Sequence, residues 1–382
     1  MMNFNKFLRW LSSPKLTIAC LSGVMILVFF GTLEQVQSGI HFAQEKYFRS
    51  LFVYGQINGF PVKIPYFPGG YLFAGALLLN LISAYAVYFR FSRKKIGILL
   101  IHLGIVLLIV GEVLTGFFSV ESQMVVGVGG SSNFSESLRE MELVVIEKSA
   151  SEFDQVVTIP GRVLRSGKAL HLSSLPFSLH FKKVYANARL LGGDGKKSPH
   201  QVADRGLGAE IQVIPLPQNN RDDEINNLTT FVEIKEGDNS LGTWLLARAI
   251  TTPQPFHLNG KDYELFIRRT RYYYPFSIQL DNFVREMYTG ADIPKSFSSH
   301  VRLFREDGEL ERQSIISMNN PLRFGGKAFY QASYAENDTI SVLQVVDNPG
   351  KILPYLSSGL VGVGLLIQFL MSIYRFEKKK KL

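Results

Sequence analysis

The sequence predicts an integral membrane protein with four transmembrane α-helices and a large extracytoplasmic all-β domain. Four apolar segments are each long enough to cross a bilayer as a helix, which takes about 20 residues. The long region between the third and fourth segments alternates apolar and polar residues with the period of β-strands. Lys and Arg gather at one end of each apolar segment, as they do in cytoplasmic loops.

The positive charge of the chain belongs to the flanks of the apolar segments. The formal net charge is +9. Residues 119–351 contain 26 basic and 28 acidic side chains, whereas the rest of the chain contains 15 and 4. A nucleic-acid-binding protein needs a basic stripe on a folded domain, and the sequence offers none, so we exclude that class.

The segments flanking the spans set the expected topology. Both termini are expected in the cytoplasm, because the N-terminal arm, the link between the second and third spans and the C-terminal tail are all basic. The first span lacks a small-x-small cleavage signature, so we expect a retained anchor. The expected cytoplasmic segments are 1–15, 90–95 and 375–382; the spans are 16–33, 69–89, 96–118 and 352–374; the extracytoplasmic segments are 34–68 and 119–351.

The first extracytoplasmic segment is short and carries an amphipathic pattern over residues 36–48. That pattern is typical of a helix lying in the membrane interface. A solvated loop is an equally good interpretation, and the sequence leaves both open.

The second extracytoplasmic segment has about 230 residues, enough for a sizeable core or two small lobes. Its apolar residues alternate, and Gly-rich turns separate the runs, so we expect a sandwich or an open barrel. The phrase Pro-Phe-Ser followed by alternating apolar residues occurs twice, at Pro176 and at Pro275. The repeat suggests two related lobes, and chance similarity of strand starts is the alternative.

Few residues outside the spans suggest chemistry. The single cysteine, Cys20, lies in an apolar run, so the chain has no disulfide pair, CxxC redox motif or cysteine-based zinc site. No nucleotide-binding or hydrolase motif occurs, and we predict no independent catalytic site. The histidines of the β domain are scattered and are expected to be structural: His171, His180, His200, His257 and His300.

His102 is the residue we single out, because it is the histidine in the apolar runs. An ionisable ring in hydrocarbon usually has a function or a partner, and imidazole is a common ligand of haem iron and other metals. We therefore predict His102 as a cofactor-binding residue and metal ligand. The alternative is a hydrogen bond to a neighbouring helix, at Ser83, Ser357 or Ser358.

The position of His102 is consistent with haem in the inner half of the bilayer. It lies seven residues after Lys95, or about 10 Å along a helix. The basic residues at this boundary would lie near haem propionates, although positive charge here also simply sets topology. A buried haem commonly has two axial ligands. The second is either a methionine or water, or it comes from a partner subunit, which is what we expect. These basic residues are Arg90, Arg93, Lys94 and Lys95.

Two further features of the third span bear on this site. Glu112 lies about 15 Å beyond His102 along the helix and cannot touch it directly. It either reaches water at the outer interface or has a proton-linked or packing role. Gly97, Gly104 and Gly111 recur every seven residues, so one face of the helix is expected to pack closely on another helix.

Several phrases, in order, resemble the ResB family of cytochrome c biogenesis proteins over nearly the whole chain. They are Gly31-Thr-Leu-Glu-Gln35, Ala43-Gln-Glu-Lys-Tyr-Phe48, the run Ile101–Gly111 around His102, Tyr274-Pro-Phe-Ser277, the segments Gly290–Phe297 and Asn319–Arg323, and Gly326–Tyr334. The β domain is shorter than in some members, which leaves any docking surface in the missing parts in doubt.

The resemblance implies a haem-handling subunit of the System II pathway in the cell inner membrane. Such a subunit helps carry haem b across the membrane and present it for covalent attachment to apocytochrome c, as part of a cytochrome c synthase complex. The implied partner is a CcsA/ResC-type membrane protein with a tryptophan-rich motif. This chain has only Trp10 and Trp244 and is therefore the other subunit. The family's intramembrane histidine corresponds to His102.

Two alternatives remain open. The chain is a structural or sensing scaffold that presents a β domain, with His102 as a packing residue, or it is a b-type electron-transfer subunit. The second alternative usually needs four intramembrane histidines for two haems, and the predicted spans contain one.

Overall fold

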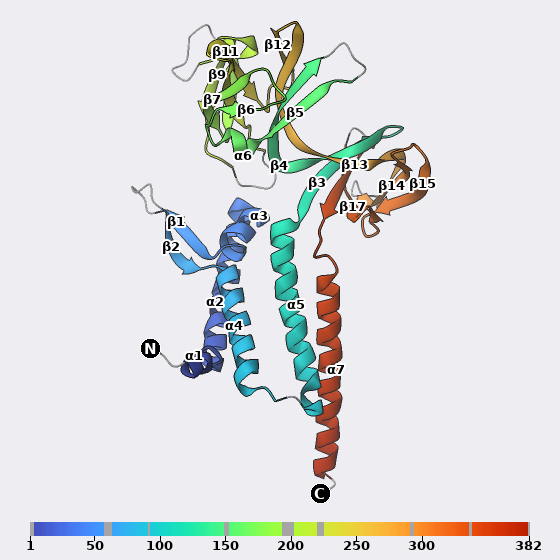
Figure 1. Ribbon diagram of the computed structural model, residues 1–382. Helices are drawn as coiled ribbons and strands as arrows, with labels where there is room; N and C mark the ends of the chain where they lie inside the picture. The colour runs from blue at the N-terminus through green and yellow to red at the C-terminus, as the bar shows by residue number, and fades with distance from the viewer. Residues whose placement is uncertain are drawn as a thin grey trace. The chain divides into compact units, whose positions relative to one another are not determined.

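The computed structural model describes residues 4–56, 63–90, 92–148, 153–192, 202–219, 225–290, 294–335 and 338–380. The chain forms two compact units (Figure 1). The helical unit contains residues 1–120 and 347–382, and the β unit contains residues 121–219 and 224–346. The predicted combination of four apolar helices and an all-β domain is confirmed.

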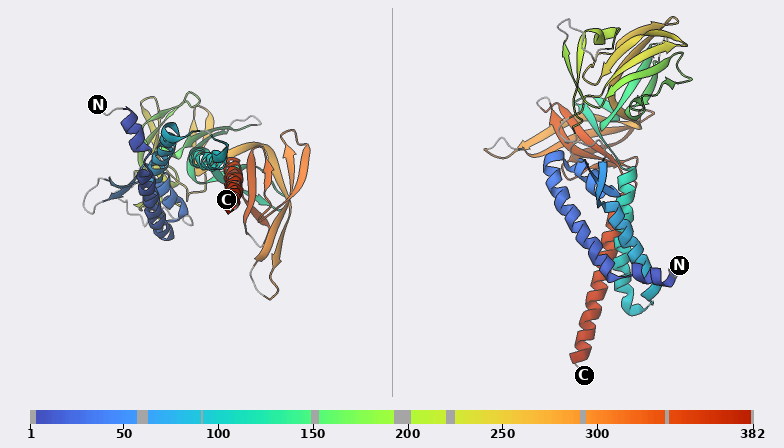
Figure 2. Two further views of the ribbon diagram at one scale, coloured as in Figure 1. Left: turned by 90° about the horizontal axis from the view of Figure 1, so that it is seen from below. Right: turned by 90° about the vertical axis from the view of Figure 1, so that its left-hand side faces the viewer.

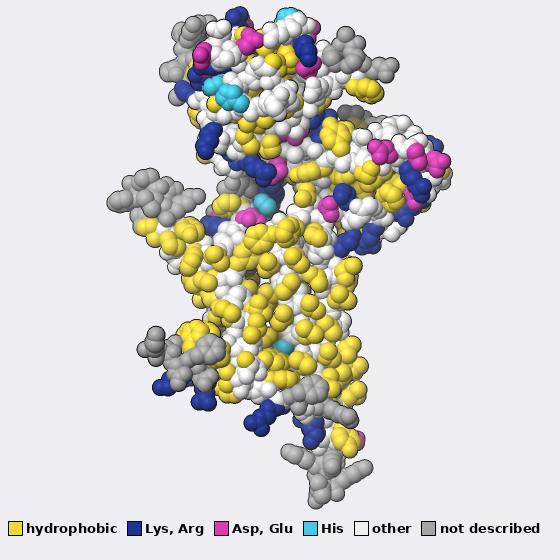
Figure 3. All heavy atoms as spheres, in the orientation of Figure 1, with side chains coloured by type: hydrophobic (Ala, Val, Ile, Leu, Met, Phe, Trp, Pro, Cys, Tyr) yellow, Lys and Arg dark blue, Asp and Glu magenta, His cyan; other side chains and the backbone are white. Residues whose placement is uncertain are grey.

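The helical unit contains four helices that are long and apolar enough to cross a membrane. Hydrophobic side chains cover the visible face of these helices, and Lys and Arg side chains lie around their lower end (Figure 3). The first long helix begins where Ser13 accepts a hydrogen bond from the Lys15 amide and Pro14 occupies the first turn. The helices are α1 (Phe4–Leu11), α2 (Pro14–Ser38), α4 (Gly70–Tyr88), α5 (Ile96–Phe118) and α7 (Leu353–Lys380), and a 3₁₀ turn (Arg93–Lys95) leads into α5.

Helices α5 and α7 pack through the glycine face that the sequence predicted. A Cβ atom on Gly97 would lie 2.8 Å from the Gly364 carbonyl oxygen, and one on Gly104 would lie 2.8 Å from the Ser357 carbonyl oxygen. A Cβ atom on Gly111 would lie 3.0 Å from the Cβ of Leu353. Such close approach gives extensive van der Waals contact, which holds helices together where there is no water to exclude.

Helices α1, α2 and α4 are joined by polar groups and by one aromatic ring. The Asn80 amide nitrogen on α4 donates to the carbonyl oxygens of Leu11 (2.5 Å) and Ser13 (3.1 Å). Thr17 donates to the Asn80 carbonyl oxygen at 2.8 Å. The Phe73 ring lies where a Cβ on Gly23 would be. Asn80 therefore satisfies the Leu11 carbonyl group at the end of α1, and its bond to Ser13 ties α4 to the start of α2.

The described residues between α2 and α4 form helical turns and a β-hairpin. A short helix, α3 (Ile40–Ala43), continues into a π-helical turn, η1 (Gln44–Phe48), so the helical interpretation of residues 36–48 is confirmed in part. A hairpin of β1 (Phe52–Gln56) and β2 (Lys63–Pro68) follows. We did not predict this hairpin. Its second strand contains Pro65 and Pro68, which a two-stranded sheet tolerates because both of its strands are edges.

The β unit contains one ten-stranded sheet, one four-stranded sheet and a separate two-stranded ladder (Figure 2). All of its ladders between named strands are antiparallel, as expected for an all-β domain. The strands are β3 (Val120–Gly127), β4 (Ser131–Lys148), β5 (Gln155–Pro160), β6 (Leu170–His171), β7 (Ser178–Tyr185), β8 (Ala188–Gly192), β9 (Ile211–Pro215), β10 (Thr229–Glu236), β11 (Asn239–Ala247), β12 (Gln254–Leu258), β13 (Lys261–Met287), β14 (Pro294–Arg305), β15 (Leu310–Ser317), β16 (Leu322–Phe324), β17 (Lys327–Ala335) and β18 (Ile340–Asp347), with short helical turns at α6 (Gly161–Leu164) and η3 (Gly206–Glu210).

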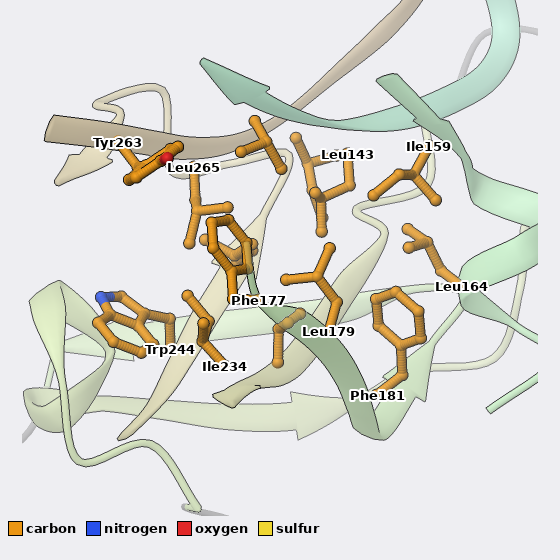
Figure 4. Close-up of a cluster of buried hydrophobic side chains, with 14 of the residues drawn as sticks. Leu143, Ile159, Leu164, Phe177, Leu179, Phe181, Ile234, Trp244, Tyr263 and Leu265 are labelled. Carbon is orange, nitrogen blue, oxygen red and sulfur yellow. The ribbon is translucent and has the colours of Figure 1, made fainter. Parts of the chain in front are cut away.

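Two large hydrophobic cores fill the β unit, and the repeated phrase contributes one copy to each. In the first core, Leu179 and Phe181 of β7 lie on the side of Leu143 and Ile159, and Phe177, just before β7, packs on Tyr263 of β13 (Figure 4). In the second core, the corresponding side chains of β13 are Phe276, Ile278 and Leu280. The two cores agree with the expected two lobes, and each copy buries every second residue as a strand on a core must.

Strands β4 and β13 pair with each other beside both cores. Their ladder is interrupted between Tyr273 and Ile278, so β13 leaves β4 there before pairing resumes. The interruption coincides with the second copy of the repeated phrase, whose Pro275 has no N–H group to donate to a ladder. Tyr274 instead bonds through its hydroxyl to Ser135 of β4, and the rings of Tyr274 and Phe276 stack at 5.2 Å.

A buried carboxylate in the first lobe predicts a dependence of stability on pH. Glu147 accepts hydrogen bonds from Lys261 (2.5 Å) and Tyr263 (3.2 Å), and the Lys261 bond in particular holds the pKa of Glu147 below its ordinary value. A lowered pKa in the folded state stabilises the fold above the unfolded pKa of about 4.3, and this stability is lost as pH falls through the folded value. Denaturant titrations should show that Glu147→Gln lowers the free energy of unfolding at pH 7. Between pH 7 and pH 3 this free energy should fall less in the variant than in the wild type. The exposed turn variant Glu309→Gln should behave as the wild type, and equal pH profiles for all three proteins would contradict the prediction.

Candidate functional site: a histidine between two helix pairs

The orientation of His102 follows from the glycine face of α5. Because Gly97, Gly104 and Gly111 face α7, His102 lies on another side of the helix and is directed toward α4. There the Tyr85 hydroxyl lies 2.7 Å from His102 Nδ1, and the two rings meet edge to face with centroids 5.6 Å apart. The His102 side chain is half-buried.

The Tyr85 hydrogen bond determines what the imidazole can do. A neutral imidazole has one N–H donor and one acceptor nitrogen. If the Tyr85 oxygen accepts the Nδ1 proton, the Nε2 lone pair is available to a metal, and a histidine ligand ordinarily uses its other nitrogen in this way. Tyr85 itself packs on Phe89 with centroids 4.6 Å apart, and the Lys95 ammonium lies 5.7 Å from the Phe89 centroid.

The site lies where two pairs of helices meet. One pair is α2 with α4 and the other is α5 with α7, and the contacts that join the pairs include Tyr85 with His102. Nearer the other end of these helices, Tyr71 stacks on Phe117 at 5.8 Å. Arg49, just after η1, pairs with Glu112 at 3.4 Å. A ligand at His102 would therefore lie at a boundary between packed elements, where binding sites of helical bundles commonly occur.

The donor set fits a single axial ligand to haem iron. Among the described residues, no group of three or more His, Cys, Asp or Glu side chains is placed to hold a metal ion. A protein-only metal site at His102 is therefore not supported by the described part of the chain. One imidazole, the apolar helices and the exposed Lys94 and Lys95 at the start of α5 match the needs of a porphyrin with two carboxylates.

The structure gives His102 a different hydrogen-bond partner from the three serines considered as alternatives. Ser357 is buried and donates to the Gly104 carbonyl oxygen at 2.6 Å, so it links α7 to α5. Ser83 is buried on α4, and Ser358 is exposed. The partner is Tyr85, which the sequence did not indicate because a tyrosine near the end of a span is typical of the aromatic belt at the membrane surface.

The histidines of the β unit are mostly scattered over that unit, as expected from the sequence. His171 and His180 lie together with ring centroids 6.0 Å apart, and burial lowers the pKa of His180. The exposed His257 lies 2.8 Å from Asp262, and His300 is half-buried on β14. His200 lies outside the described residues. Cys20 is buried on α2 as a free thiol, as expected.

These features define the class of the molecule. Among the described residues, four helices have the length and composition of membrane spans, and they are followed or preceded by an all-β unit in the same chain. One histidine, His102, lies in these helices, and Tyr85 of a neighbouring helix forms a hydrogen bond with it. Comparison with known proteins adds a family similarity over part of the chain. Residues 256–342 match the ResB-like family, and over this segment the resemblance predicted from the sequence is confirmed.

A curated relative is also similar to part of the chain. Protein NrfI of Wolinella succinogenes is 35% identical over 103 residues, a segment covering 27% of this chain and 11% of NrfI. The aligned segment thus spans about a tenth of that relative's length. The family match lies in the β unit and covers most of the second core, whereas His102 lies outside it.

Proposed function

We propose that this chain is a haem-handling subunit of a System II cytochrome c maturation complex. Similarity to the ResB-like family and to NrfI supports a role in cytochrome c biogenesis. The observation that carries the haem assignment is His102, whose Nδ1 is held by Tyr85 at 2.7 Å between two helix pairs. Haem is the cargo in this proposal, and the helices would be inserted in the cytoplasmic membrane with both termini inside.

In this function His102 binds haem iron through Nε2, and a histidine of a CcsA/ResC-type partner supplies the second axial ligand. Tyr85 positions the imidazole: in the tautomer that leaves Nε2 unprotonated, its oxygen accepts a hydrogen bond from Nδ1–H. Lys94 and Lys95 offer positive charge to the propionates at the inner end of α5. The apolar helix surfaces exclude water from the porphyrin.

The β unit would hold the apocytochrome c or brace the partner protein. A pocket of about 770 Å³ lies within the segment that matches the family, beside the interrupted ladder at Tyr274 and Phe276. Haem attachment also needs reduced thiols, and the one thiol of this chain is buried on α2. The reductant therefore comes from another protein.

The test is to purify the chain together with its tryptophan-motif partner and record the absorption spectrum. We expect a haem Soret band from the complex and attachment of haem to a co-expressed c-type cytochrome. A colourless complex that still supports maturation would instead favour the scaffold alternative, in which His102 only packs against Tyr85.

A milder prediction concerns the residue that positions His102. Tyr85→Phe keeps the ring but removes the oxygen that bonds to Nδ1, so the imidazole loses the hydrogen bond that orients it. We expect haem affinity to fall by about 10-fold or more, as for other outer partners of metal ligands. Titrating haem into the purified complex measures this, with a shifted Soret band in the variant. Tyr88→Phe, at the exposed end of α4, is the matched control. Equal affinities for Tyr85→Phe and the wild type would remove the positioning role.

A further inference from the structure

A pocket of about 370 Å³ lies in the helical unit at the end of α2 that leads into η1. Its wall is formed by Gly31, Thr32 and Gln35 of α2, Gln44 and Phe48 of η1, and Glu112 of α5, and Arg49 also lines it. The haem site does not include any of these residues. The volume lies within the usual range of sites for small ligands, about 300–1,000 Å³.

This pocket brings together two phrases that carry the family resemblance, Gly31–Gln35 and Ala43–Phe48. They are separated in sequence, and the π-helical turn Gln44–Phe48 places the second beside the first. Gly31 permits this approach, because a Cβ atom there would lie 2.9 Å from the Phe48 ring. Single π-helical turns occur frequently at functional sites.

At the pocket wall the partly buried cation Arg49 lies between two accessible anions, Glu112 of the wall and Glu45 beside it. The Arg49 side chain is only 19% exposed, whereas the Glu45 and Glu112 side chains are 50% and 62% exposed. Both carboxylates lie 3.4 Å from the guanidinium nitrogens, longer than the usual 2.7–2.9 Å of a charge-assisted bond. The N–H donors of the guanidinium, five in number, therefore form only long hydrogen bonds with these carboxylates. Glu112 is the one Asp, Glu, Lys or Arg residue of α5.

We propose that this pocket binds the zwitterionic headgroup of a phospholipid that carries a phosphate and a primary ammonium. The phosphate accepts hydrogen bonds from Arg49, and the ammonium donates to Glu112. The apolar lining, such as Phe48, contacts the glycerol region. Glu112 lies six residues before the end of α5, or about 9 Å along the helix, so the pocket lies toward that end of α5.

The charge pattern distinguishes this headgroup from the two nearest alternatives. A phosphatidylglycerol headgroup has no cation, so Glu45 and Glu112 would repel it. A phosphatidylcholine headgroup has a cation without N–H donors, which cannot hydrogen-bond to Glu112. The site should therefore prefer phosphatidylethanolamine to both.

The experiment measures lipid binding to the full chain in detergent by native mass spectrometry, with phosphatidylethanolamine, phosphatidylglycerol and phosphatidylcholine of the same acyl chains. We expect the wild type to bind phosphatidylethanolamine about 10-fold more tightly, the scale of one charge-assisted hydrogen bond. Glu112→Gln should remove the preference over phosphatidylglycerol, and Arg49→Gln should weaken binding of all three lipids. Arg302→Gln, which breaks an exposed ion pair with Asp281 in the β unit, is the control and should match the wild type.

Soluble competitors separate the sources of binding. Free phosphoethanolamine should displace the lipid, and inorganic phosphate should do so much less well. Equal binding of the three lipids, equal displacement by phosphate, or an unchanged preference in Glu112→Gln would each overturn the proposal. The same measurements on His102→Ala should match the wild type, so this result is independent of the proposed haem function.

Discussion

Replacing His102 by alanine should leave the purified complex with its partner nearly colourless. The variant removes one axial ligand from an apolar site, where water cannot replace it well. We expect the haem-to-protein ratio to fall by about 10-fold or more, because even partners one shell away from a metal change affinity by that factor. The ratio of Soret absorbance to protein absorbance measures the effect, and maturation of a c-type cytochrome should fall with it.

Two companion variants separate a lost ligand from a lost fold. His102→Gly with added imidazole should regain the Soret band, since the free base can occupy the space left by the side chain and reach the same iron. His257→Ala should keep full haem content, because His257 is an exposed residue of β12 that pairs with Asp262. If His102→Ala retained its haem and its activity, the ligand role would have to be abandoned.

The sequence predicts those features of the site that are set within a single helix, and it does not predict contacts between helices. The seven-residue spacing of Gly97, Gly104 and Gly111 defines one face of α5, and the structure packs that face on α7. The same periodicity directs His102 away from α7. Tyr85 and Arg49 are different, because their contacts to α5 depend on how separate helices pack, and no local pattern encodes that geometry.

In the β unit, too, the sequence predicts local structure but not the pairing of distant strands. Alternation predicted strands and an all-β fold, because period two follows from the strand itself. It did not predict that β13 would extend over residues Lys261–Met287 and contribute to both cores. That arrangement depends on pairing with β4, a register set between distant residues. The proximity of His171 and His180 has a similar cause, since they meet across the β6–β7 ladder.

Introducing a side chain at Gly104 should disrupt the packing of α5 on α7. A Cβ atom there would lie 2.6 Å from Val361 and 2.8 Å from the Ser357 carbonyl oxygen, and the backbone oxygen cannot simply rotate away. Forcing extra atoms into a packed site costs about 1–3 kcal/mol for small additions. We expect Gly104→Ala to be destabilised by an amount in this range and Gly104→Leu by more, as measured by SDS-induced unfolding in mixed micelles.

The control for this change is another glycine in a span. A Cβ atom added to Gly75 on α4 would have no neighbouring atom within 4 Å, so Gly75→Ala should be neutral or slightly stabilising. The comparison also tests the link between packing and the haem site, because the α5–α7 contact sets the direction of His102. Gly104→Leu should therefore lose haem as well as stability, whereas Gly75→Ala should keep both. Equal stability of Gly104→Ala and Gly75→Ala would show that α5 and α7 do not pack through this face.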